Sequence, residues 1–322
     1  MMLDQYRIHR VTHRSWQSRA IRALVPLVVS MQFQSSRTSE PDVARLRARA
    51  NRMSWPGRMV SRILHPQIEH FNDGLVDAEW TWDKRDGDMP HAAILYLHGG
   101  AYYFGSAATH RAVAVELARR SGISVFMPDY RLAPEHPFPA ALDDAISAYH
   151  ALLARGFDSK SIVLAGDSAG GGLAMATLIA LRDRGEPMPA GAVLFSPWVD
   201  LSSTGSACRG GPGMNIVAME TAARMYVGHA SRFDPLASPA RAYLGGLPPI
   251  HIHVSDSEAL YGQSSDLEQR LRRAEIPVEL YVWESMPHAW HCFTPLLPEA
   301  RSALRVASEF VTRRLGAHAG VC

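Results

Sequence analysis

Short apolar and β-branched runs alternate with amphipathic stretches along the chain from about residue 91 onward. The runs predict strands at 76–82, 92–98, 124–127, 161–165, 192–195, 250–254 and 278–283. The stretches between them predict helices at 110–121, 140–155, 169–184, 265–274 and 298–315. Because strands and helices that alternate in this way are typical of crossover connections, the pattern predicts an α/β fold with a mostly parallel central sheet flanked by helices.

Two stretches fall outside this alternation. A helix is expected at 41–53, before any strand, and the stretch 201–232 is rich in Gly and Met. We therefore expect the two to form a helical cap over one site. The expected parts are an N-terminal helical segment at 1–65 that contributes to the cap, an α/β core at 66–200 and 236–322, and a cap insertion at 201–235.

The predicted strand 161–165 runs into Gly166-Asp167-Ser168-Ala169-Gly170 and then into a helix. This is the G-x-S-x-G pattern in the strand–turn–helix setting of a nucleophile elbow. We expect Gly166 and Gly170 to remove Cβ atoms that would clash where strand and helix approach. Ser168 is the candidate nucleophile, and the N–H of Ala169 at the helix N-terminus is a candidate oxyanion donor. Patterns of this length also occur in ordinary Gly-rich turns.

A second glycine pair follows the predicted strand 92–98, in the run His98-Gly99-Gly100-Ala101. Consecutive glycines let backbone N–H groups turn toward one point, as in the HGGG-type oxyanion loop of lipases and esterases. We expect Gly99 and Gly100 to join Ala169 in an oxyanion hole. The alternative is a plain turn at the end of a strand.

A serine nucleophile needs a base and an acid, and in this fold both follow it in the sequence. Of the fifteen histidines, His288 lies between the last predicted strand and the last helix, with His291 as its near rival. Asp256 and Glu258 both follow the strand 250–254, and either carboxylate could orient an imidazole. Their spacing does not separate them.

Candidate substrate contacts are less specific than the candidate triad. They are Tyr102, Tyr103, Asp167 and Met214, which follow the oxyanion loop, lie within the elbow or belong to the proposed cap insertion. Aromatic and Met side chains could line an apolar pocket. Ordinary packing is the alternative for each of the apolar ones.

Composition and charge narrow the class of protein. Hydrophobic residues make up 47% and charged residues 20% of 322, which is typical of a globular chain. The formal net charge of +2 gives no basis for a nucleic-acid-binding surface. Three widely spaced cysteines, Cys208, Cys292 and Cys322, fit neither a disulfide framework nor a zinc site and favour the cytoplasm. The apolar stretch 23–31 is too short to span a bilayer, although the arginines before it imitate a signal peptide and leave secretion open.

Four segments together resemble the bacterial hormone-sensitive-lipase-like esterases of the α/β-hydrolase superfamily. They are His98–Ala101, the run 129–140 (Asp-Tyr-Arg-Leu-Ala-Pro-Glu-His-Pro-Phe-Pro-Ala), Gly166–Gly170 and Met286-Pro287-His288. The Pro density of the second segment suggests a rigid loop that braces the oxyanion loop. The frame Glu258-Ala259-Leu260 resembles the segment that carries the family's acid, which favours Glu258 over Asp256.

The resemblance implies an α/β-hydrolase fold with a helical cap and a triad of Ser168, Glu258 and His288. It implies hydrolysis of carboxylic esters with short to medium acyl chains through an acyl-enzyme, with no metal or organic cofactor. Ala101 replaces the family's third glycine and should keep a backbone donor. A lactone hydrolase or amidase with the same triad is the alternative activity, and a non-enzymatic small-molecule receptor is the alternative class. Family members also suggest a homodimer through 278–283 and 298–315.

Overall fold

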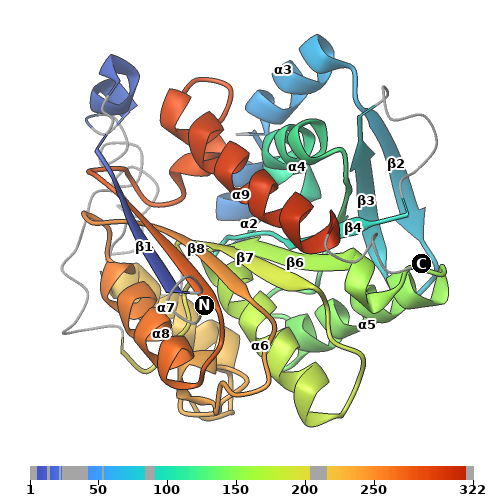
Figure 1. The fold of residues 1–322 in the computed structure, drawn as a ribbon, viewed down its shortest axis with the longest axis vertical. Coiled ribbons are helices and arrows are strands. Elements are labelled where there is room, and N and C mark those ends of the chain that lie inside the picture. The colour runs from blue at the N-terminus through green and yellow to red at the C-terminus, as the bar shows by residue number, and fades with distance from the viewer. Residues whose placement is uncertain are drawn as a thin grey trace.

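Nine strands form one sheet within the residues that the computed structural model describes, which are 6–12, 15–21, 23, 43–52, 54–83, 91–203 and 216–316 (Figure 1). The strands are β1 (Tyr6–Val11), β2 (Gln67–Asn72), β3 (Asp77–Trp82), β4 (Ala93–Leu97), β5 (Ser124–Pro128), β6 (Ile162–Asp167), β7 (Gly191–Phe195), β8 (Ile250–Ser255) and β9 (Val278–Trp283). Their order is β1-β9-β8-β7-β6-β4-β5-β3-β2. Neighbours are parallel except that β3 runs antiparallel to β5 and to β2. The predicted α/β-hydrolase fold with a mostly parallel sheet is confirmed.

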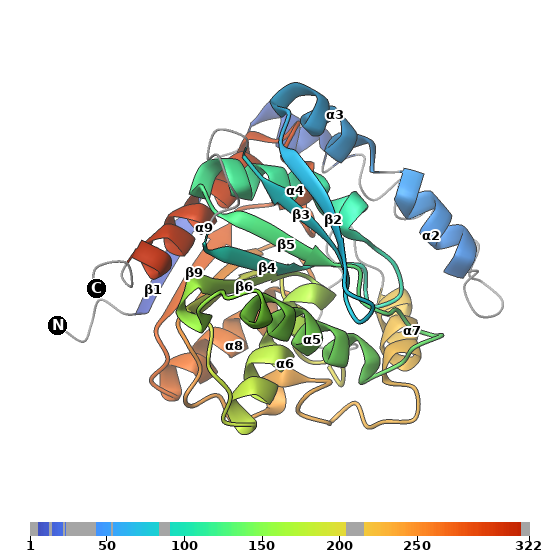
Figure 2. The same ribbon diagram turned by 90° about the vertical axis from the view of Figure 1, so that its right-hand side faces the viewer.

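Helices cover both faces of this sheet. The helices are α2 (Val43–Arg52), α3 (Trp55–Leu64), α4 (Ala107–Ser121), α5 (Ala140–Ala154), α6 (Ala169–Asp183), α7 (Ile216–Val227), α8 (Tyr261–Arg273) and α9 (Pro298–Gly316). Figure 2 shows α4 and α9 on one face, with α3 outside α4, and α5, α6 and α8 on the other. No helix in the described part of the chain has the length and apolar character needed to cross a bilayer.

The central strands are apolar on both sides because both of their faces meet helices. In β4, Ile94 and Tyr96 pack in a cluster with residues of α4 and α9. Leu95 and Leu97, which point to the opposite face, pack in a larger cluster with residues of α5 and α6. A continuous apolar run is therefore what a central parallel strand requires.

The strands and helices predicted within the α/β core form, with boundaries that shift by a few residues. The largest shift is in α8, which begins at Tyr261, four residues before the predicted start. The strand β2 and the helix α3 were not predicted. Most residues of β2 are exposed, because it is an edge strand, so it lacks the apolar run that marks the central strands.

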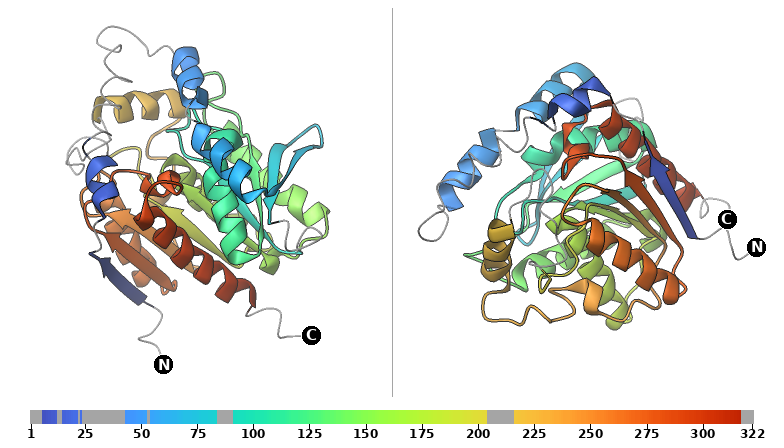
Figure 3. Two further views of the ribbon diagram at one scale, coloured as in Figure 1. Left: turned by 90° about the horizontal axis from the view of Figure 1, so that it is seen from above. Right: turned by 90° about the vertical axis from the view of Figure 1, so that its left-hand side faces the viewer.

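The expectation that 1–65 is a helical segment is wrong at its start. Residues Tyr6–Val11 form β1, which pairs in parallel with β9 from Tyr6↔Val278 to Val11↔Trp283. Figure 3 shows β1 at the edge of the sheet beside β9. The β9 edge is therefore paired with β1 of the same chain. The homodimer expected through 278–283 and 298–315 stays a prediction.

Because β4, β6, β8 and β9 all run in the same direction, their carboxyl ends lie at the same end of the sheet. The segments that leave these ends are the loop after Leu97, the turn at Ser168, the turn after Ser255 and the loop after Trp283. All the candidate catalytic side chains stand on these four segments.

Candidate active site

Ser168 stands in a strained turn between β6 and α6. Its φ of 54° and ψ of −120° lie outside the regions that side chains favour. The turn is held from both sides, because Ser168 N donates to Phe195 O at 2.8 Å and its carbonyl accepts from Trp198 N at 2.8 Å. Neighbouring backbone of the segment after β7 therefore fixes a conformation that would otherwise relax.

The two elbow glycines are required by close approach, as the sequence predicted. A Cβ on Gly166 would lie 2.4 Å from Gly170 O, and a Cβ on Gly170 would lie 2.0 Å from Leu97 O. Both distances are shorter than any van der Waals contact. The start of α6 can thus lie directly against the ends of β4 and β6.

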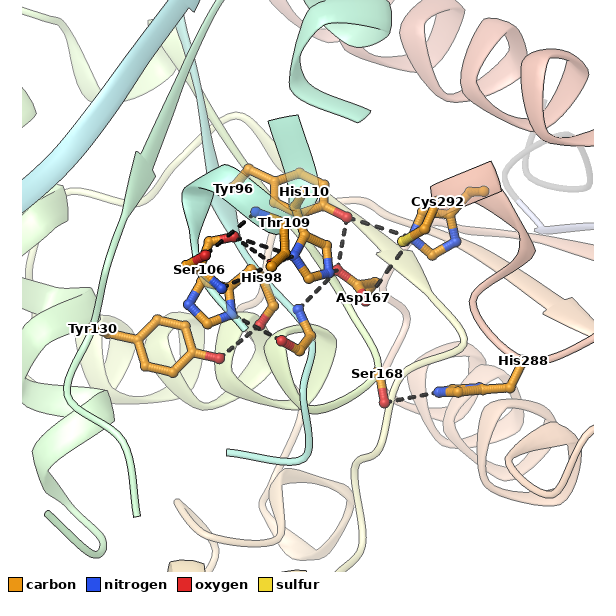
Figure 4. A network of polar contacts seen from close by, with 12 residues as sticks. Tyr96, His98, Ser106, Thr109, His110, Tyr130, Asp167, Ser168, His288 and Cys292 are labelled. Atoms are coloured by element: carbon orange, nitrogen blue, oxygen red, sulfur yellow. Dashed lines mark hydrogen bonds and ion pairs between the residues drawn. The ribbon is translucent and has the colours of Figure 1, made fainter. Parts of the chain in front are cut away.

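The structure brings Ser168, His288 and Glu258 together in one line of hydrogen bonds. Nε2 of His288 is 2.9 Å from Ser168 Oγ (Figure 4), and Nδ1 of His288 is 3.2 Å from Glu258 Oε2. Ser196 Oγ donates to the same carboxylate oxygen at 2.9 Å. Glu258 is buried, so its carboxylate is held in one position.

The rival acid and the rival base lie elsewhere. Asp256 is exposed, and its Oδ1 accepts a hydrogen bond from Ser285 N at 2.8 Å. His291 is fully buried and stacks on Phe195 with ring centroids 4.4 Å apart. Of the two alternatives for each position, the structure places His288 beside Ser168 and Glu258 beside His288.

The N–H of Gly99 is not available for the oxyanion hole, contrary to the prediction from the sequence. Its N–H donates to Asp167 Oδ1 at 2.9 Å, so this donor is already occupied. The N–H groups of Gly100 and Ala101 have no such partner among the described residues. Gly100 and Ala101 both have positive φ values, 126° and 51°, which turn the chain sharply after Gly99. Ala169 is the first residue of α6, where an N–H has no partner within its helix.

The loop after β5 braces the oxyanion loop, as its Pro content suggested. Tyr130 stacks on His98 with centroids 4.2 Å apart, and its hydroxyl donates to His98 O at 2.6 Å. Ala133 N donates to Tyr102 O at 2.9 Å, farther along the same loop. Two turns of the chain are thereby tied together beside the nucleophile.

The four candidate substrate contacts lie in different environments in the structure. Tyr102 and Tyr103 are buried, at 1% and 3% exposed, and their contact with substrate stays a prediction. Tyr102 stacks on Tyr226 of α7, with centroids 3.6 Å apart. The assignment of Asp167 to substrate is wrong, because its buried carboxylate points away from the nucleophile into a polar network. Met214 lies outside the described residues.

Comparison with known proteins decides the family. A sequence model of the α/β-hydrolase fold matches residues 94–292. A crystal structure of an esterase from the bacterial hormone-sensitive lipase family superposes with a TM-score of 0.80 at 35% identity, over 94% of this chain and 100% of that one. The chain belongs to the bacterial hormone-sensitive-lipase-like esterases of the α/β-hydrolase superfamily. As a member of this esterase family, it is a carboxylic ester hydrolase.

Two further relatives of this esterase family resemble the chain. An acetyl-hydrolase of Streptomyces hygroscopicus is 43% identical over 248 residues, which are 76% of this chain and 82% of the relative. The crystal structure of EstE5 soaked with p-nitrophenyl butyrate has a TM-score of 0.79 and 32% identity, over 94% of this chain and 100% of that chain.

A buried polar network behind the esterase nucleophile was not predicted. Asp167 accepts from Tyr96 OH at 2.8 Å and faces His110 Nε2 at 3.4 Å (Figure 4). Burial alone would raise the pKa of Asp167, but the charge of His110 holds it well below its usual range. Burial alone would lower the pKa of His110, but Asp167 raises it well above the ordinary value. The two therefore form a buried ion pair.

Cys292 borders this network through the short 3-10 helix η6 (Trp290–Phe293). Its Sγ lies 3.5 Å from His291 Nε2. Burial would raise the pKa of the Cys292 thiol, but the neighbouring His291 lowers it to about 7. Among the described residues, Cys292, His110 and Asp167 bring potential metal-binding atoms within 4.8 Å of one another. Because Asp167 Oδ1 already accepts from Tyr96 and Gly99, the cluster satisfies its own hydrogen bonds.

No local pattern marked these residues in the sequence. His110 stands in a helix and Ser196 in a turn, with no motif around either. His110 contacts Asp167 because α4 packs near the end of β6, and Ser196 contacts Glu258 because the segment after β7 lies beside the turn after β8.

Proposed function

We propose that the chain cleaves carboxylic esters of short to medium acyl chain through an acyl-enzyme on Ser168. The observation that carries this proposal is the hydrogen-bonded line from Ser168 Oγ through His288 to Glu258 Oε2, at 2.9 Å and 3.2 Å. The same distances are those expected of a nucleophile, its base and the group that orients the base.

Each side chain has one task in this proposal. Nε2 of His288 accepts the Ser168 proton while Oγ attacks the ester carbonyl, and the imidazolium then returns the proton to the leaving alcohol. Nδ1–H of His288 donates to Glu258, which fixes the tautomer and stabilises the imidazolium. Water then attacks the acyl-enzyme by the same route. Ser196 keeps the Glu258 carboxylate in place.

The negative oxygen is held by the N–H groups of Gly100, Ala101 and Ala169. This set replaces Gly99, whose N–H is bonded to Asp167, by Ala101. Each such donor contributes typically about 3 kcal/mol to the transition state. Gly99 instead anchors the loop that carries two of the three donors.

We further propose that α2 and α7 act as the cap. Arg47 of α2 donates from Nε to Tyr103 O at 2.8 Å, and Tyr226 of α7 stacks on Tyr102. Both helices thus contact the segment that follows the oxyanion loop. A cap that packs so closely favours small acyl groups, and the acetyl-hydrolase name of one relative points the same way.

We also propose a cytoplasmic location, because the three widely spaced cysteines do not fit a disulfide framework.

The proposal is tested with p-nitrophenyl esters from acetate to palmitate. Activity should be highest on the short chains and disappear in Ser168→Ala, which leaves the folded structure intact. Ser264→Ala is the matched control, because Ser264 is also buried and its hydroxyl has no partner among the described residues. Ser264→Ala should keep wild-type turnover.

Other outcomes would revise the proposal. Substantial turnover by Ser168→Ala would exclude Ser168 as the nucleophile. Faster turnover of lactones than of linear esters, lost in the same variant, would keep the triad and replace the substrate class.

A further inference from the structure

Positive and negative charges are separated along this chain. Residues 1–64 contain twelve arginines and three acidic residues, a formal charge of +9, whereas the rest has 21 basic and 28 acidic residues, a charge of −7. The near-neutral total of +2 hides this difference. Within the described part, the positive charge is concentrated in α2 and α3, because residues 43–64 contain six arginines and no acidic residue.

Helix α3 is amphipathic, but part of its apolar surface is uncovered. Gly57 and Val60 face α4, where Val60 packs with Ala112 and Val115. Ile63 and Leu64 at the end of the helix remain 66% and 40% exposed. Arg58 and Arg62, one turn apart, are exposed on the same helix. Exposed aliphatic side chains beside arginines are what an interfacial helix presents to a lipid surface.

A cavity of about 240 Å³ opens beside these side chains. Met59, Ile63 and Leu64 of α3 line it together with Glu116, Arg119 and Arg301, and Arg119 pairs with Glu116. The guanidinium of Arg301 donates to Thr294 O at 3.3 Å, in the segment that follows η6. Apolar side chains beside the Arg301 guanidinium, which donates to backbone carbonyls, suit an anionic amphiphile better than a neutral solute.

One of the basic helices, α2, also contacts the segment that follows the oxyanion loop. Arg47 of α2 donates to Tyr103 O and, at 2.9 Å, to Ala133 O, and pairs with Glu135. Tyr103 is the second residue after Ala101 of the oxyanion loop. Figure 2 shows α2 and α3 along one outer side of the molecule. A surface that docks through these helices is therefore connected, through Arg47, to the segment that follows the oxyanion loop.

We propose that α2 and α3 dock the enzyme on anionic lipid bilayers, with the exposed residues Arg52, Arg58, Arg62, Ile63 and Leu64 as the docking surface. The basic side chains attract the anionic leaflet, and Ile63 and Leu64 enter the headgroup region. A soluble polyanion would use the arginines but gain nothing from the aliphatic pair, which is why a bilayer is the occupant that fits. The docking does not depend on the triad.

The test is co-sedimentation of the full chain with vesicles. Phosphatidylcholine vesicles with added phosphatidylglycerol should retain the protein at low salt, and retention should weaken as salt screens the charges. Vesicles of phosphatidylcholine alone should not retain it. R58Q/R62Q should weaken binding about 25-fold, at about fivefold for each arginine. I63S/L64S should weaken it too, at unchanged salt dependence.

Matched controls separate this surface from charge in general. Arg273→Gln removes an exposed arginine from α8 on the opposite face of the sheet, and Leu75→Ser removes an exposed leucine from the β2–β3 turn, far from α3 (Figure 1). Both controls should bind vesicles like the wild type.

All variants should hydrolyse a water-soluble short ester like the wild type, which shows that they fold. Equal retention of R58Q/R62Q and wild type, no retention of wild type on anionic vesicles, or binding to dextran sulfate without binding to vesicles would each overturn the proposal. Loss of ester hydrolysis in Ser168→Ala has no bearing on it.

Discussion

Asp167 Oδ1 accepts a hydrogen bond from the backbone N–H of Gly99 at 2.9 Å. The residue before the nucleophile is thus tied to the first glycine of the oxyanion loop. His110, paired with the same carboxylate, keeps it charged. Through this contact, the elbow and the oxyanion loop hold one relative position.

Asp167→Asn should lower kcat about 10- to 100-fold and leave KM nearly unchanged. The loop donors act on charge that develops only in the transition state, so a looser loop costs rate rather than substrate binding. The buried His110 would also lose its partner, at a cost of roughly 3 kcal/mol in the free energy of unfolding. Steady-state kinetics and urea unfolding measure both, with the exposed Asp183→Asn as control. A raised KM with normal kcat would contradict the positioning role.

Glu258→Gln and Asp256→Asn separate the two carboxylates. Glu258→Gln should lower kcat by about 10⁴-fold, because an amide no longer stabilises the imidazolium or fixes its tautomer. Asp256→Asn should stay close to wild type, since the exposed Asp256 carboxylate accepts from Ser285 N and, among the described residues, from no catalytic side chain. The reverse order in a p-nitrophenyl ester assay would reassign the acid.

Gly170→Ala should destabilise the fold by roughly 3 kcal/mol, because its new Cβ would lie 2.0 Å from a carbonyl oxygen that β4 holds in place. The matched change is Gly316→Ala at the end of α9, where a Cβ meets no atom within 4 Å. Chemical denaturation of both proteins gives the comparison. Similar midpoints would show that the strand–helix approach can relax.

His98 makes stability depend on pH. Burial lowers its pKa to about 3, so between that value and about 6.5 the unfolded chain binds a proton that the folded chain does not. Stability from this group is therefore present above about pH 6.5 and is lost as the pH falls toward 3. Relative to His98→Asn, the wild type should lose about 1.4 kcal/mol more per pH unit between about pH 6 and pH 4. Parallel curves of unfolding free energy against pH would show that His98 is not buried neutral.

The sequence predicted the features that depend on local order. The elbow, the strand–helix alternation and the positions of Ser168, Glu258 and His288 at the ends of strands all follow from short segments. The use of the Gly99 N–H could not be predicted in this way, because it depends on where the Asp167 side chain points after two distant turns have packed. His110 and Ser196 were missed for the same reason.

The two edge strands, β1 and β2, were also not predicted from the sequence, and the reason is physical. A strand with one exposed face and one free edge needs few apolar residues, so β1 and β2 read as polar segments. Their pairing partners, rather than their own composition, determine that they are extended.

The pairing of β1 with β9 also constrains the order in which the protein can fold during synthesis. Residues 6–11 leave the ribosome long before their partners at 278–283. β1 therefore has no place in the sheet until β9 has been made. Closing such a long loop is entropically slow, so sealing of this edge should be among the last steps of maturation.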